Sequence, residues 1–99
     1  APVQVVVLPV SEKYADYAQK VTSNLKKQGL RARFDLRNEK IGYKIREHTL
    51  LKVPYMIIVG EREQADETLS PRSLKGDDLG AMSADQFVAT LHEVLAKHQ

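Results

Sequence analysis

The chain has 99 residues, of which 42% are hydrophobic and 28% charged, and its formal net charge is +2. This length predicts one domain with a genuine hydrophobic core, and the composition is that of an ordinary soluble globular protein. The absence of cysteine excludes disulfides, thiolate metal ligands and a cysteine nucleophile.

The first residues, 1–9, are apolar but cannot cross a membrane, because a spanning helix needs roughly 20 apolar residues. They follow no basic segment, so they do not have the form of a signal peptide. The chain does not begin with methionine, so we expect a fragment of a longer protein or a processed chain.

The first third of the chain predicts a strand and then a helix. Val3 to Val10 is a β-branched run between prolines, which predicts a buried strand. Ser11 can cap a helix along which apolar residues recur every three or four positions. Gly29 ends this helix, and the cations Lys26 and Lys27 in its last turn suit the helix dipole.

The middle third predicts two more strands around a second helix. Residues 30–36 alternate apolar and polar, which indicates a half-buried strand. Asn38 can cap the second helix, whose Ile41 and Ile45 share one face. Residues 53–59 form another buried strand.

The last third is less regular. Residues 61–67 indicate a loop or hairpin tip, and 68–74 and 79–82 are weak strand candidates. Ser83 can cap a final helix. Early strand–helix alternation implies right-handed crossovers and a parallel sheet centre. We therefore predict a single α/β domain over residues 1–99, in three layers, with a mixed, largely parallel sheet of about five strands flanked by three helices.

Positive charge is concentrated in residues 26–52. This stretch holds nine Lys or Arg and three acidic residues, a net charge of +6, whereas the rest of the chain has a net charge of −4. Such a concentration at one strand–helix junction suits phosphates, so nucleic acid is a candidate partner beside acidic metabolites and acidic proteins. A solvated helix face is the ordinary alternative.

Patterns for catalysis and metal binding are weak. The three histidines, His48, His92 and His98, fit no metal-ligand spacing. The sequence has no nucleophile-elbow signature and no glycine loop that cradles phosphates. We therefore expect no catalytic residue and no metal site in this chain.

The run from Asp35 to Glu47, DLRNEKIGYKIRE, resembles the C-terminal anticodon-binding domain of threonyl-tRNA synthetases, as do Val53–Met56, Gly60 and Gly76–Met82. The resemblance covers essentially the whole chain, and sister domains of prolyl-, glycyl- and histidyl-tRNA synthetases match it less well. It implies a mixed sheet of roughly five strands with three helices, in agreement with the predicted elements. It also implies that the chain binds the anticodon loop of threonine tRNA as a module of a class II threonine–tRNA ligase.

The resemblance assigns roles to individual residues. Asn38, Glu63 and Arg72 are implied as contacts to splayed anticodon bases. An arginine can pair with the acceptor edge of guanine, and a carboxylate can accept from its Watson–Crick N–H groups. Five cations would contact phosphates and set the register: Arg37, Lys40, Lys44, Arg46 and Lys52. The alternatives are a plain helix cap for Asn38 and ordinary surface charge for Glu63 and Arg72.

The resemblance further implies a cytoplasmic parent enzyme, not bound to a membrane, that forms a homodimer through its catalytic domain. ATP, magnesium and zinc would bind to that parent outside this domain, which would itself need no cofactor. Two other functions stay open: a detached paralogue acting as a regulatory or protein-interaction module, and a small domain that binds an acidic metabolite at the strand ends. Pro71 before Arg72 predicts an edge or bulged strand at that position.

Overall fold

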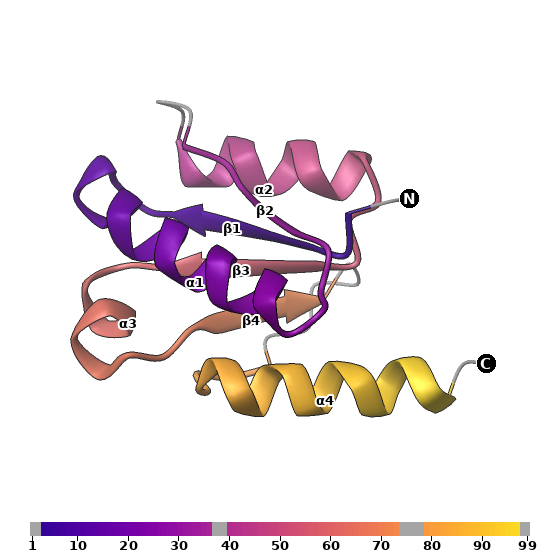
Figure 1. The fold of residues 1–99 in the computed structure, drawn as a ribbon. Helices are drawn as coiled ribbons and strands as arrows, with labels where there is room; N and C mark the ends of the chain where they lie inside the picture. The colour runs from indigo at the N-terminus through magenta and orange to yellow at the C-terminus, as the bar shows by residue number, and fades with distance from the viewer. Residues whose placement is uncertain (1–2, 37–39, 74–78, 98–99) are drawn as a thin grey trace.

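The computed structural model describes residues 3–36, 40–73 and 79–97, with side chains described as far as residue 93 (Figure 1). It confirms the predicted α/β class. In chain order the elements are β1 (Val5–Pro9), the 3-10 helix η1 (Glu12–Tyr14), α1 (Ala15–Lys27), β2 (Ala32–Phe34), α2 (Ile41–Leu50), β3 (Tyr55–Val59), α3 (Glu61–Asp66), β4 (Ser70–Ser73) and α4 (Ala84–Lys97).

The described strands form one mixed sheet of four strands in the order β2-β1-β3-β4. β1 pairs in parallel with both β2 and β3, and β4 runs antiparallel to β3. The prediction of a largely parallel centre is therefore confirmed. β2 and β4 are the two edges of this four-stranded sheet.

Helices cover both faces of the sheet, as the three-layer prediction requires. Successive side chains of a strand point to opposite faces. Val5 and Val7 therefore join the cluster under α1 and α4, where Phe87 also packs. Val6 and Leu8 join the second cluster, against which residues of α2 pack. Figure 1 shows α2 on one side of the sheet and α1 and α4 on the other.

The predicted fifth strand, residues 79–82, is reduced to a single bridge among the described residues. Leu69 and Met82 exchange backbone hydrogen bonds of 2.8 and 2.9 Å. Gly80, two residues before Met82, has φ of +80°, a left-handed conformation that interrupts an extended strand. The segment therefore touches the sheet without forming a ladder, and the sheet has four strands where about five were predicted.

Pro71 lies on an edge strand, as predicted. It pairs with Ile57 in a regular antiparallel register, without a bulge. Its carbonyl oxygen accepts a hydrogen bond from the backbone N–H of Leu79 at 3.1 Å, so this side of the residue faces away from β3. The missing N–H of proline consequently costs no bond within the β3–β4 ladder.

The prediction of a loop over residues 61–67 is wrong, because 61–66 form helix α3. The described residues therefore contain four α-helices where three were predicted. The side chain of Glu63 closes the first turn by accepting from the N–H of Gly60 at 2.7 Å. Glu67, with φ of +55°, ends the helix in the left-handed conformation. The charged sequence carries no apolar stripe that would signal a helix.

Other helix boundaries were predicted with mixed success. The Oγ atoms of Ser11 and Ser83 accept backbone N–H groups at 3.2 Å, which confirms both as caps. Ser11, however, caps the short 3-10 helix η1, and α1 begins only at Ala15. Gly29 has φ of +92° just after α1, which confirms the predicted end of that helix. The predicted cap of α2 is wrong: the helix begins at Ile41 with Lys40 in the N-cap position and no side-chain cap. Asn38 lies outside the described residues.

In the described part of the chain no helix has both the length and the apolar character that a membrane span requires.

Candidate nucleic-acid interface

The sheet face that carries α2 continues to the edge strand β4. Across β3 and β4, Met56 faces Arg72 and Ile58 faces Ser70. Directly paired residues of antiparallel strands lie on the same face. Because Met56 packs in the cluster under α2, Ser70 and Arg72 also lie on the α2 face. We call the surface formed by Ile58, Ser70 and Arg72 the β4 strip.

The last turn of helix α2 reaches β3 next to the β4 strip. The Oγ1 atom of Thr49 is 4.0 Å from the sulfur of Met56, the residue that pairs with Arg72. Gly42, Arg46 and Thr49 follow one another at intervals of four and three residues, so they share one side of the helix, which we call the α2 flank. Arg46 is exposed, and no neighbouring atom lies within 4 Å of where a Cβ of Gly42 would be. The flank therefore offers a cation and free space beside the strip.

Glu63 reaches the β4 strip from the start of α3. Its Oε2 atom accepts from the hydroxyl of Ser70 at 3.2 Å, while Oε1 accepts from the N–H of Gly60 at 2.7 Å. Ser70 and Arg72 are two residues apart on one strand, so their side chains are on the same face about 6.5 Å apart. The structure therefore brings Glu63 and Arg72, two of the three predicted base contacts, to one surface.

Glu63 also has a structural role that the sequence prediction missed. Glu63→Ala is expected to lower the free energy of unfolding by about 0.5–2 kcal/mol, because it removes the cap of α3 and its tie to β4. Glu63→Gln keeps an acceptor for the N–H of Gly60, so its free energy of unfolding should fall by less. Urea unfolding measures both. Glu61→Ala, an exposed change in the same first turn, is the control, expected within about 0.5 kcal/mol of the original chain. If Glu63→Ala and Glu61→Ala lower the free energy of unfolding equally, Glu63 does not cap α3.

The predicted phosphate contacts on α2 are spread over its length. Lys40 is exposed at the N-terminus, where free backbone N–H groups also favour anions. Arg46 is exposed on the α2 flank, one turn before its end. Lys52 is exposed beyond the opposite end of the helix, which is about 15 Å long, so it is remote from Lys40. Arg37 lies outside the described residues.

The predicted phosphate contact of Lys44 requires correction. The residue is only 3% exposed, and its ammonium group donates to the carbonyl oxygen of Asp35 at 3.1 Å. It therefore faces the sheet and not the solvent. A signal was present in the sequence, because Lys44 lies three residues after Ile41 and four before His48, on the inward side of the helix.

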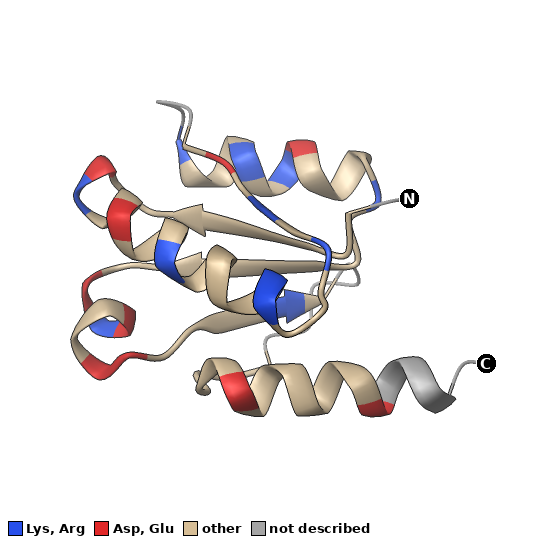
Figure 2. Cartoon of the chain, in the orientation of Figure 1, with Lys and Arg blue, Asp and Glu red and all other residues tan. Residues whose placement is uncertain are grey.

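The charges around the β4 strip are unevenly distributed (Figure 2). Lys and Arg segments gather over α2, β2 and the C-terminal end of α1, whereas acidic segments surround α3. Glu61, Asp66 and Glu67 are exposed in and just after α3. A polyanion on the strip is therefore attracted toward α2 and repelled from α3, which sets the side on which its phosphates lie.

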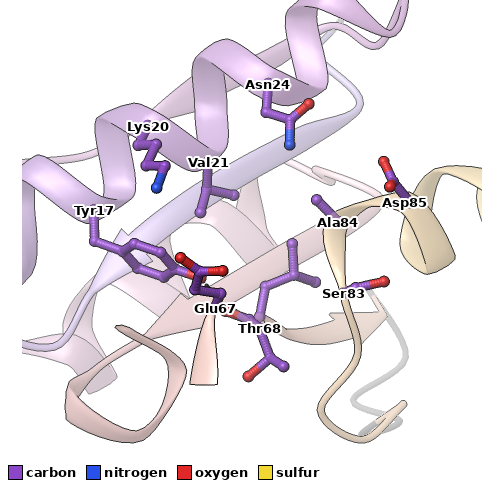
Figure 3. Close-up of a pocket in the computed structure, with 10 residues that line it drawn as sticks. Tyr17, Lys20, Val21, Asn24, Glu67, Thr68, Ser83, Ala84 and Asp85 are labelled. Atoms are coloured by element: carbon purple, nitrogen blue, oxygen red, sulfur yellow. Dashed lines mark hydrogen bonds between the residues drawn. The ribbon is translucent and has the colours of Figure 1, made fainter. Parts of the chain in front are cut away.

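A separate polar cavity of about 220 Å³ lies on the opposite face, between α1, the α3–β4 connection and the start of α4 (Figure 3). The hydroxyl of Tyr17 donates to the carbonyl oxygen of Thr68 at 2.6 Å. Burial, then the charges of Glu67 and Glu63, raise the pKa of Tyr17 above its ordinary 10.0, so the hydroxyl remains a donor. The side chains of Glu67 and Asp85 line the cavity and disfavour a phosphate there.

Comparison with known proteins agrees with this arrangement. Residues 4–94 match the family described as "Anticodon binding domain". A "Threonine--tRNA ligase" of Acidithiobacillus ferrooxidans is 56% identical over 94 residues, which cover 95% of this chain and 15% of that protein. A "Threonine--tRNA ligase" of Halorhodospira halophila is 52% identical over 99 residues, which cover 100% of this chain and 16% of that protein.

A solved structure supports the same assignment. The RNA binding domain of threonyl-tRNA synthetase from Cryptosporidium parvum Iowa II matches with a TM-score of 0.87 and 30% identity, covering 94% of this chain and 24% of that one. This chain thus spans only 15–16% of the length of the two curated relatives. Family match, relatives and fold agree over almost every residue. The chain belongs to the anticodon-binding domain family, in the form carried by threonyl-tRNA synthetases.

Proposed function

We propose that the chain binds the anticodon loop of threonine tRNA as the C-terminal module of a threonine–tRNA ligase. The observation that carries the proposal is the convergence of Arg72 and the Ser70-bound Glu63 on one strip of the sheet face that also carries the basic helix α2. Proteins read single-stranded RNA by splaying its bases onto such surfaces and bonding their edges. The phosphates then follow the basic side.

Arg72 and Glu63 divide the reading of a guanine between them in this proposal. The exposed guanidinium of Arg72 donates two parallel bonds to the acceptor edge of guanine. Glu63 uses both oxygens within the protein, but each carboxylate oxygen has two lone pairs. It can therefore accept from a base while it caps α3. The bond to Ser70 holds the carboxylate at the strip before RNA arrives.

The phosphates of the loop lie along α2 in this proposal. Arg46 contacts them beside the strip, and Lys40 contacts them at the first turn of the helix. Arg37 and Lys52 are retained as outer phosphate contacts and Asn38 as a third base contact, on the strength of the family resemblance. Lys44 is no longer among them, because its ammonium is buried.

We place the remaining functions in parts of a longer protein. The parent would charge threonine tRNA with ATP and magnesium, carry zinc, form a homodimer through its catalytic domain and work in the cytoplasm. Within the described residues no three His, Cys, Asp or Glu side chains converge on a common point where a metal ion could bind. Identity of 52–56% to ligases over nearly the whole chain favours this role over a detached regulatory paralogue.

Titration tests the proposal directly. The chain is titrated with the anticodon stem-loop of threonine tRNA and with a copy altered in the last two anticodon letters. We expect tighter binding to the first, because its bases match the strip. Equal affinity for the two RNAs at every salt concentration would overturn the proposed function.

A salt series separates phosphate contacts from base contacts. Arg46→Ala is expected to weaken both RNAs alike and to reduce the slope of log K against log salt by about 0.7, the value for one phosphate of a single strand. Lys20→Ala is the matched control, because Lys20 lines the cavity on the opposite face. It should leave the slope unchanged. If Arg46→Ala and Lys20→Ala have the same salt slope, Arg46 does not contact phosphate.

A further inference from the structure

Helix α2 is attached to the sheet by few apolar residues. Ile41 and Ile45 are partly buried against the cluster below the helix. Of the ten residues of α2 only Lys44 is buried, and His48 follows it one turn later on the same side. Polar contacts of Lys44 and His48 therefore help to hold α2 on the sheet.

The side chains of Lys44 and His48 both form hydrogen bonds with Asp35, the residue that directly follows β2. The backbone N–H of Asp35 donates to the carbonyl oxygen of Val7 at 3.0 Å, which ties the residue to the sheet. Lys44 donates to its carbonyl oxygen at 3.1 Å, and Nε2 of His48 lies 2.9 Å from its carboxylate oxygen Oδ2. Because a carboxylate only accepts, the hydrogen of this bond is on Nε2 of His48. We call Asp35, Lys44 and His48 the Asp35 clamp.

The clamp and the RNA-facing residues occupy opposite sides of the same helix. Lys44 and Arg46 are two residues apart, about 200° around the axis. A shift or rotation of α2 at the clamp therefore moves Arg46 relative to Arg72 across the β4 strip. A buried ammonium is costly without an oxygen to receive it, whereas apolar contacts tolerate sliding. The charged contact favours one position of the helix over its neighbours.

We propose that the Asp35 clamp positions the α2 flank against the β4 strip and thereby sets base selectivity in RNA binding. This proposal rests on the proposed function and goes beyond it. Asp35, Lys44 and His48 act through the helix and do not touch RNA. They are positioning residues, and their loss disturbs recognition while the domain stays folded.

Two substitutions break the clamp and one preserves it. Lys44→Met keeps a long unbranched side chain, one atom shorter, but removes its charge and donor, and His48→Leu removes the donor to the Asp35 carboxylate. His48→Gln restores an N–H close to the position of Nε2. Val21→Ala is the control for lost stability, because Val21 is 5% exposed in the cluster under α1, on the other face.

Hydrogen exchange and RNA titration are measured on the whole 99-residue chain. Lys44→Met and His48→Leu should speed exchange in α2 relative to α1 by about tenfold or more, the scale of a lost hydrogen bond to a charged group. The same variants should reduce the preference for the threonine anticodon over the altered copy. His48→Gln should retain much of the slow exchange in α2 and much of the anticodon preference. Val21→Ala should leave the anticodon preference unchanged.

The results distinguish the two proposals. If α2 exchanges faster but the anticodon preference is unchanged, the clamp is only structural and this inference fails, while the proposed function stands. Relative exchange in α2 that does not change in Lys44→Met and His48→Leu also overturns the clamp. If the original chain shows no preference for the threonine anticodon, the proposed function fails. The clamp then has no base selectivity to set, and this inference fails with it.

Discussion

Arg72→Ala is expected to weaken binding of the threonine anticodon loop by about 1–3 kcal/mol and to relax the preference for one anticodon letter. The physical reason is the loss of two parallel bonds to a guanine edge on the β4 strip. Arg72 is exposed and pairs with β3 through its backbone, so the fold should be unaffected. Titration with RNAs altered at single anticodon letters measures the effect.

Arg62→Ala is the matched control for this prediction. Arg62 is also an exposed arginine, but it lies in α3 among acidic residues. Its removal should change affinity little and selectivity not at all. If the original chain and Arg72→Ala respond identically to a change in the second anticodon letter, Arg72 does not read a base.

Phe87→Ala is expected to lower the free energy of unfolding by about 3–5 kcal/mol, the range for removal of a large side chain from a core. Phe87 is 1% exposed, and its ring meets that of Tyr55 edge to face, with 5.8 Å between centroids and an interplanar angle of 80°. The contact joins α4 to the sheet. A domain of this size has only about 5–15 kcal/mol of stability in total, so urea unfolding should show a large shift.

Phe34→Ala provides the comparison, because the chain has two phenylalanines and they occupy opposite environments. Phe34 is 41% exposed on the edge strand β2. Its replacement should cost about 1 kcal/mol or less. Similar losses from both substitutions would mean that the cluster under α1 and α4 is not the main core.

Much of the fold could be predicted from local patterns, and the failures have physical causes. The alternation over residues 30–36 predicted a strand with four apolar residues on one face: Leu30, Ala32, Phe34 and Leu36. Three of them do pack in or against one cluster, but the prediction is wrong for Phe34, which is exposed. Helix α3 was missed because its stabilising contacts come from a side-chain cap and from Ser70 on another strand. Such contacts leave no period in the sequence.

The candidate site could be predicted only in part. The family resemblance named Glu63 and Arg72, but nothing in their spacing indicated that both lie at one strip. Their proximity follows from the antiparallel pairing of β4 with β3 and from the bond between Glu63 and Ser70. Asn38 and Arg37 lie outside the described residues, so their roles stay predictions.

The sequence by itself determined the class of fold, the parallel centre of the sheet and the family, because apolar periodicity and a long motif are local properties of the chain. Only the tertiary structure decided which cations face solvent. Lys44 was counted with its charged neighbours, yet it is buried because Asp35 offers a carbonyl oxygen at the end of an adjacent strand. The cost of burying a charge depends on partners that folding brings together, so linear order could not reveal it.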